Sequence, residues 1–276
     1  MVSRRARPRR IALVLVVAVL AAAATALAQF SLISVRDEIE IGRETDRQVR
    51  QQVPELRDRQ VVAYVQQIGR QLAAHAPGPE YPYTFTVADY AELNAFALPG
   101  GPVWIHRGVL QAATNEAQVA AVLGHEIAHI AQRHAAEQLS KSMVANGLLG
   151  LLGALLGNEG GARTARIGAG LLANGVFLKF SRDDEREADR VGMEIAYRAG
   201  WDPRGMVEFL QLLQQEQRRR PSAVETFFSS HPSPEGRVEQ LQADARSMGT
   251  GRRTSRAFTD VQRRLRQLPP AQPMKK

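Results

Sequence analysis

The 276-residue chain contains no cysteine. This absence excludes disulfide bonds, thiolate metal sites, lipid attachment through cysteine and catalysis by a thiol. Any metal ion that the chain binds must therefore be held by histidine and carboxylate side chains. The hydrophobic content of 44% is enough to bury a full core, either in one large domain or in two small ones.

Acidic residues are outnumbered by basic ones, and the formal net charge is +8. The excess lies at the two ends of the chain. Residues 1–10 hold five arginines, residues 252–276 hold eight basic side chains and one acidic one, and the body between them is mildly acidic. A basic tail could contact phosphates or lipid headgroups, but we expect a solvated terminus at residues 250–276 and no nucleic-acid partner.

The first 28 residues have the pattern of a secretory signal peptide. An arginine-rich start is followed by the apolar run Ile11–Ala24 and by Ala26-Leu27-Ala28, which fits a cleavage site of the A-x-A type. The alternative is an uncleaved N-terminal anchor in the inner membrane, because residues 11–28 are about long enough to span a bilayer. Both alternatives predict a protein of the periplasm or cell envelope.

The sequence HEIAH at residues 125–129 is the strongest chemical signal in the chain. Apolar residues around it recur at helical spacing, and Asn115 is a candidate N-cap. On a helix, His125 and His129 differ by about 40° in direction, so both imidazoles can bind one ion, and this pattern suits zinc. Glu126 is then placed to accept a proton from the attacking water. The alternative is a chance match with two solvated histidines.

A second helix, predicted over Phe180–Arg198 with Ser181 as its N-cap, carries candidate carboxylates. Glu185 and Asp189 fall on the face turned toward the core, whereas Glu187 is about 200° from Glu185 and is predicted to point away. The alternative is a surface stripe of acidic and basic side chains.

His134 follows the motif closely but is not expected to join it. It lies five residues after His129, about 140° around a regular helix. We therefore predict that His134 packs on the far side, steadying the motif helix against the segment 180–198.

The remaining patterns predict a mainly helical α+β domain with a small sheet directly before the motif helix. The edge of such a sheet can pair with an extended peptide through main-chain hydrogen bonds. The expected helices are Val35–Gln52, Asp58–Ala74, Arg204–Arg218 and Ala257–Leu268; the expected strands are Tyr83–Val87, Asn94–Leu98 and Val103–Ile105; a loop is expected at Phe227–Pro232.

Two apolar runs rich in glycine, Gly147–Gly157 and Ile167–Val176, follow the motif helix. Each is too short to span a membrane. A weakly specified helix of this composition could act as a lid, grip a peptide or contact lipid, and the alternative is an ordinary buried helical hairpin.

Four separated segments together resemble one family, the HtpX and BepA-like metallopeptidases, which also contains the CAAX prenyl proteases. The likeness covers roughly residues 35–245. The segments are NAFALPGG at 94–101, HEIAHIAQRH at 125–134, FSRDDEREAD at 180–189 and SSHP at 229–232. We expect neither the transmembrane helices of HtpX and the prenyl proteases nor the C-terminal helical repeats of BepA in this sequence, and prenylated substrates are therefore not expected.

The resemblance implies a zincin-like metallopeptidase domain at residues 29–249 that binds one Zn²⁺ ion. It implies that the zinc ligands are His125, His129 and Glu185, and that Glu126 is the general base. By the same resemblance, Asp189 accepts a hydrogen bond that orients a ligand histidine. His231 matches the family's HP-loop histidine, which lies close to the metal and either blocks or assists the site.

The expected function is that of a zinc metalloendopeptidase that cleaves unfolded or misassembled cell-envelope proteins. Its partners would be polypeptide substrates, with peripheral membrane contact through Gly147–Gly157 and the basic tail. One alternative is a holdase that binds such proteins without cleaving them, but the complete set of catalytic side chains disfavours it. A lipid or small-molecule hydrolase with the same zinc chemistry is disfavoured by the extended edge strand.

Overall fold

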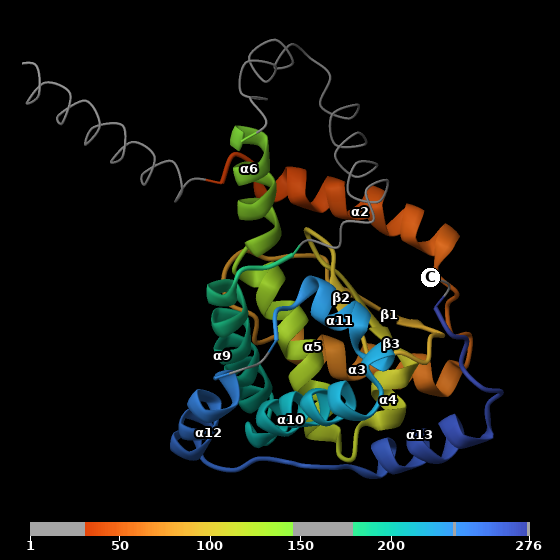
Figure 1. Ribbon diagram of the computed structural model, residues 1–276. Helices are drawn as coiled ribbons and strands as arrows, with labels where there is room; N and C mark the ends of the chain where they lie inside the picture. The colour runs from red at the N-terminus through yellow and green to blue at the C-terminus, as the bar shows by residue number, and fades with distance from the viewer. Residues whose placement is uncertain (1–30, 146–178, 234–235, 275–276) are drawn as a thin grey trace, which may run out of the picture.

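The computed structural model describes residues 31–145, 179–233 and 236–274 (Figure 1). The predicted signal peptide at 1–28 and the two glycine-rich runs at 147–157 and 167–176 lie outside the described residues. None of the helices described is both long enough and apolar enough to cross a membrane.

The prediction of a mainly helical α+β fold with a small sheet is confirmed. Helices α2 (Val35–Gln52) and α3 (Arg59–Ala73) precede the strands β1 (Thr84–Ala88), β2 (Ala95–Ala97) and β3 (Pro102–His106). Helices α4 (Arg107–Ala112), α5 (Glu116–Ala131) and α6 (His134–Ala145) follow. The later elements are α9 (Arg182–Arg198), α10 (Arg204–Arg219), η1 (Pro221–Ala223), α11 (Glu225–Ser230), α12 (Arg237–Met248) and α13 (Arg256–Gln267).

Several helices begin at a residue whose side chain satisfies one of their first free N–H groups. Asn115 accepts a hydrogen bond from the N–H of Gln118 at the start of α5, as predicted. Ser181 forms a reciprocal capping box with Asp184 at the start of α9. These local contacts fix the beginning of the two helices that carry the candidate site.

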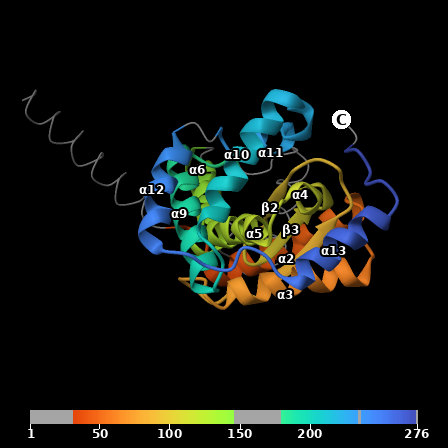
Figure 2. The same cartoon turned by 90° about the horizontal axis from the view of Figure 1, so that it is seen from below.

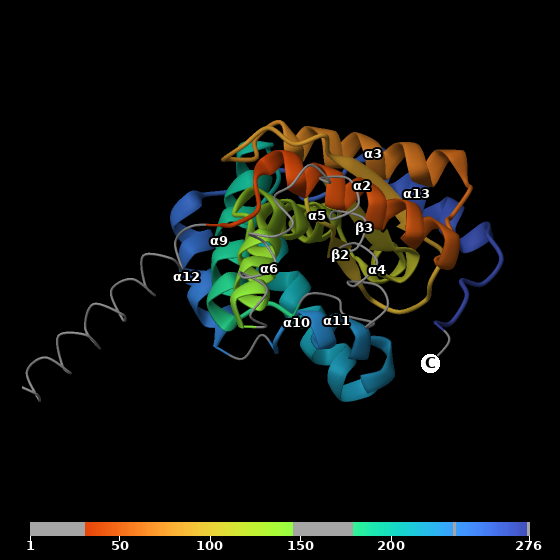
Figure 3. The same ribbon diagram turned by 90° about the horizontal axis from the view of Figure 1, so that it is seen from above.

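The three strands form one sheet in the order β1-β3-β2, with β1 parallel and β2 antiparallel to β3. The turn between β2 and β3 requires two glycines, because Gly100 and Gly101 have φ values of 72° and 135°. Strand β2 lies at the edge of the sheet and packs next to α5. The sheet therefore presents an edge strand to the motif helix, and α2 covers its upper face (Figure 3).

Helix α5 runs through the centre of the molecule, surrounded by α3, α9 and α10 (Figures 1 and 2). All of its residues are buried. Its closest partner is α9, because Gly124 and Gly192 face each other and leave no room for a side chain between the two backbones. This close approach brings the acidic face of α9 onto the histidines of α5.

Two expectations for the C-terminal half are wrong. The segment 227–232, expected as a loop, lies largely in the short helix α11, which ends at Ser230 with His231 as its C-cap residue. The expected solvated terminus contains α13, whose Phe258, Val261 and Leu265 are buried in the main core. Their spacing of three and four residues forms one apolar stripe, which packs beside α3 and α4 (Figure 2).

Candidate active site

The two histidines of the HEIAH motif converge as the helical spacing predicts. His125 Nε2 and His129 Nε2 lie 3.0 Å apart, and both rings are buried. Both Nε2 atoms therefore face the same point beside α5.

Two further groups, from α9 and from the end of α11, reach the same point. Glu185 Oε1 lies 3.4 Å from His129 Nε2, and His231 Nδ1 lies 2.8 Å from Glu185 Oε1 and 3.4 Å from His125 Nε2. One ligand atom from each of the four residues lies within 4.8 Å of all the others. Three nitrogens and a carboxylate oxygen in so small a buried space could hold a metal ion, and the donor types suit zinc.

The neighbouring polar atoms also fit a bound cation. Glu126 is completely buried, and neither of its carboxylate oxygens makes a hydrogen bond with the described residues. His231 Nε2 is likewise without a hydrogen-bond partner there and lies 3.6 Å from Glu126 Oε1. Because an unpaired buried carboxylate is costly, a positive ion with its water next to Glu126 would account for this arrangement.

Burial and neighbouring charges set the protonation of these groups. Burial raises the pKa of Glu126, and the neighbouring imidazoles only partly offset this rise. Burial would also raise the pKa of Glu185, but His231 and His129 outweigh it and hold this pKa well below its usual range. Burial keeps the pKa of His129 well below its usual range, so the ring stays neutral and able to bind a metal.

Asp189 lies directly behind His125. Its Oδ1 is 3.0 Å from His125 Nδ1, and Arg237 donates to both of its oxygens at 2.6 and 2.7 Å. Burial opposes ionisation, but His125 and Arg237 together lower the pKa of Asp189. The acceptor position predicted for Asp189 is therefore occupied by a carboxylate that is itself held in place.

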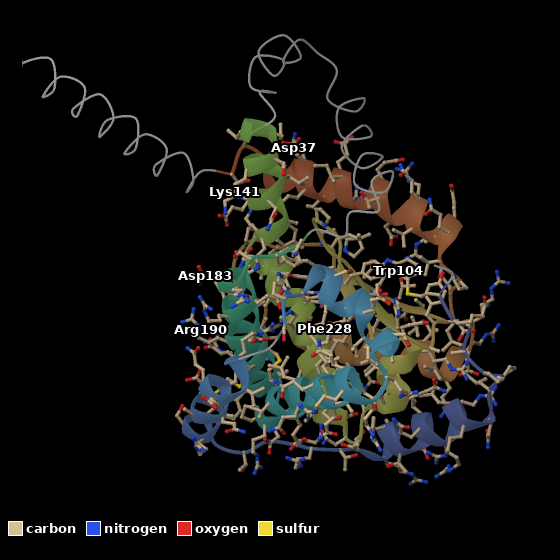
Figure 4. The ribbon with its side chains drawn as sticks, in the orientation of Figure 1. Asp37, Trp104, Lys141, Asp183, Arg190 and Phe228 are labelled. Atoms are coloured by element: carbon tan, nitrogen blue, oxygen red, sulfur yellow. The ribbon has the colours of Figure 1, made fainter. Side chains whose placement is uncertain are left out.

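Arg237, the first residue of α12, was not singled out by the sequence. It is buried, and its Nη1 also lies 2.8 Å from Glu185 Oε2. The sequence contained a signal for it, because two carboxylates on one buried helix face require a buried positive partner. By contrast, Asp183 and Arg190 project from α9 away from α5 (Figure 4).

Two aromatic rings cover the cluster. Phe180 stacks on His129 with ring centroids 3.9 Å apart, and Phe227 stacks on His231 with centroids 4.6 Å apart. These contacts exclude water from one side of each imidazole and restrict its rotation.

The expected position of His134 is wrong. Helix α5 ends at Ala131, and Arg133 has a positive φ of 62°, so the helix does not continue regularly to residue 134. The break brings His134 back toward the site, with its Nδ1 2.9 Å from His129 Nδ1. His134 still contacts α9, as predicted, through Glu187.

Glu187 also differs from its prediction. Its side chain is 44% exposed, as expected for the outer face of α9, but its carboxylate contacts residues at the end of α5 and the start of α6. It accepts a hydrogen bond from Gln132 at 2.9 Å and lies 3.4 Å from His134 Nε2. The carboxylate of Glu187 is thus linked to the candidate site.

Comparison with known proteins agrees with the motifs. The model of peptidase family M48 matches residues 59–245. The chain is 32% identical over 222 residues to the beta-barrel assembly-enhancing protease of Escherichia coli (strain K12), covering 79% of this chain and 45% of the relative. It is 35% identical over 176 residues to the mitochondrial metalloendopeptidase OMA1 of Saccharomyces cerevisiae, covering 58% of this chain and 49% of the relative.

The chain spans about half the length of these relatives. The predicted resemblance to the HtpX and BepA-like metallopeptidases and the prediction of a metalloendopeptidase are confirmed at the level of the family. The chain belongs to peptidase family M48.

Proposed function

We propose that this chain is a zinc-dependent endopeptidase that cleaves unfolded or misassembled proteins of the cell envelope. The observation that carries the proposal is the buried cluster of His125, His129, Glu185 and His231, with the unpaired carboxylate of Glu126 beside it. The name of the Escherichia coli relative, a beta-barrel assembly-enhancing protease, supports an envelope substrate.

In this proposal, one zinc ion is held by His125, His129 and Glu185. Zinc, when bound, supplies a Lewis acid that polarises the scissile carbonyl and makes a water molecule more acidic. Asp189 keeps the proton of His125 on Nδ1, so that Nε2 is free to bind the metal.

Glu126 is the general base in the proposal. Its carboxylate takes a proton from the attacking water and later returns this proton to the leaving amine. The raised pKa of Glu126, which burial causes, brings it closer to neutral pH and makes proton return easier.

His231 is the residue that must move before a substrate can enter. Its Nδ1 already lies among the ligand atoms, and its Nε2 faces Glu126. We therefore assign it a blocking role in this conformation, in which its ring occupies the space between the ligand atoms and Glu126.

The outer edge of β2 supports an extended peptide as the substrate. Leu98 N–H donates to Pro102 O, and His106 N–H donates to Asn94 O, both at 2.8 Å. Because backbone groups alternate in direction along a strand, the N–H and C=O groups of Ala95 and Ala97 point away from β3. Strand β2 packs against α5, the helix that carries Glu126, so a peptide paired with this edge would run past the base.

The cellular setting belongs to the same proposal. Residues 1–28 would export the chain to the periplasm or anchor it at the inner membrane, and residues 29–249 would form the peptidase domain. Peripheral membrane contact would involve Gly147–Gly157 and the basic residues after 250.

The test is the metal content of the purified full chain together with casein cleavage. We expect one zinc per chain, cleavage within the casein chain, loss of cleavage with a chelator and recovery when zinc is returned. Casein that is bound but not cleaved by the zinc-loaded protein would favour the holdase. Chelator-insensitive cleavage would refute the zinc mechanism.

A further inference from the structure

His134 lies directly behind the metal-facing histidine His129, on the opposite side of its ring. From this placement we infer that His134 is a positioning residue for His129 and that Glu187 fixes the tautomer in which His134 acts. The inference rests on the proposed metal site, because it concerns how His129 is presented to the ion.

The direction of the hydrogen bonds follows from the atoms that face each other. His129 Nε2 lies 3.0 Å from His125 Nε2 and faces the cluster, so the hydrogen of the neutral ring must be on Nδ1. His134 Nδ1 lies 2.9 Å from that atom and must accept this hydrogen. The hydrogen of His134 is then on Nε2, which lies 3.4 Å from Glu187 Oε2.

Glu187 is well placed to keep this direction. Gln132 Nε2 donates to its other oxygen, Oε1, at 2.9 Å, which leaves Oε2 as the acceptor for His134. An ionised carboxylate can only accept hydrogen bonds. The tautomer of His134 without a hydrogen on Nε2 would therefore lose its hydrogen bond to Glu187.

The break between α5 and α6 is what brings His134 to this position. A regular helix would carry His134 about 140° around from His129. Arg133 instead adopts a left-handed conformation with φ of 62°, which is unfavourable for a residue with a side chain and persists only when other contacts hold it. Arg133 Nε donates to buried Glu38 at 3.0 Å, and its guanidinium also donates to Ile33 O.

Contacts with α2 and the segment just before it therefore stabilise the left-handed conformation of Arg133 between α5 and α6. Tyr81 donates a hydrogen bond to the same carboxylate of Glu38 that binds Arg133. As a result both ligand histidines have an acceptor at Nδ1: His125 has Asp189, and His129 has His134.

The prediction concerns zinc affinity. His134→Phe fills the space without an acceptor and should weaken zinc binding about 10- to 100-fold, the usual effect of losing a group that orients a metal ligand. His134→Asn places an amide oxygen near the lost Nδ1 and should restore most of the affinity. Glu187→Ala should weaken zinc binding in the wild-type background but have no effect in the His134→Asn background, where no tautomer has to be fixed.

Glu194→Ala is the matched control. Glu194 lies on the same helix, its side chain is 45% exposed, and it pairs with Arg198 rather than with the site. The dissociation constant for zinc is measured on the full chain by competition with a chromophoric chelator, and circular dichroism verifies the fold. The visible spectrum of the Co²⁺-loaded protein reports changes in ligand geometry without relying on activity.

The inference is overturned if folded His134→Phe binds zinc as tightly as the wild type, or if Glu187→Ala behaves like Glu194→Ala. Should His134→Phe fail to fold, the comparison of Glu187→Ala in the wild-type and His134→Asn backgrounds decides the question. Failure of the metal site itself is a different result: the wild type would then bind no zinc, and His129→Ala would be indistinguishable from it.

Discussion

The contact between Gly124 and Gly192 should control the metal site more strongly than it controls stability. A Cβ atom at residue 192 would lie 2.7 Å from His125 N and 2.8 Å from Gly124 C, whereas ordinary contacts begin near 3.4 Å. These are backbone atoms, which cannot rotate away as a flexible side chain could. Gly192→Ala therefore requires α9 to move from α5 by about 0.7 Å, the difference between the two distances.

Two opposing effects decide the change in the free energy of unfolding. Replacing glycine by alanine inside a helix normally stabilises the protein by about 1 kcal/mol. Overpacking against a rigid neighbour costs about 1–3 kcal/mol. We expect a net loss of up to about 2 kcal/mol.

The effect on zinc should be larger, because Asp189 and Glu185 lie about one and two helical turns from Gly192 and would move with α9. Metal–ligand distances tolerate errors of only about 0.2 Å. We therefore expect Gly192→Ala to weaken zinc binding about tenfold or more.

The assay combines urea unfolding of the metal-free protein with zinc competition against a chelator. Glu194→Ala, on the exposed side of the same helix, is the control and should change neither quantity appreciably. The reasoning is refuted if Gly192→Ala raises the free energy of unfolding, as helix propensity alone predicts, and leaves the zinc affinity unchanged.

Three further changes test other parts of the structure. His231→Ala vacates the position among the ligand atoms and should raise kcat/KM for a fluorogenic peptide; unchanged or lower activity would argue against blocking. The pKa of Asp189 is lowered from 3.8 in the folded protein. Its carboxylate therefore stabilises the fold above about pH 3.8, and this contribution is lost as the pH falls through the lower folded value. In urea unfolding at several pH values, the free energy of unfolding of Asp189→Asn should fall less steeply toward acid than that of the wild type. Phe258→Ala should lower the free energy of unfolding in urea by about 3–5 kcal/mol, while Arg256→Ala, at an exposed position, should change it little. Equally small effects of both substitutions would instead indicate a solvated C-terminal tail.

Local patterns predicted much of the fold because their causes are local. The cap at Asn115 and the capping box at Ser181 use residues only three positions away. The helix-face argument placed Glu185 and Asp189 inside. In each of these cases, the spacing along one helix contains the necessary information.

The errors arose where distant residues decide the conformation. The break at Arg133 is held by Glu38, which lies on another helix far earlier in the sequence, so no pattern around HEIAHIAQRH could reveal it. Arg237 reaches Asp189 only after α12 has packed beside α9. The helix at α13 was expected, but its burial was not, because its three buried apolar residues are outnumbered by arginines and other polar residues.

The most direct measurement is the zinc content and peptidase activity of Glu126→Gln beside the wild type. The substitution changes no proposed zinc ligand and keeps nearly the same volume, so it removes the proton acceptor alone. We expect one zinc per chain in both proteins and a loss of about 10²- to 10⁴-fold in kcat for the variant. Near-normal activity, or loss of zinc from a folded Glu126→Gln protein, would contradict the assignment of Glu126 as the general base of a zinc peptidase.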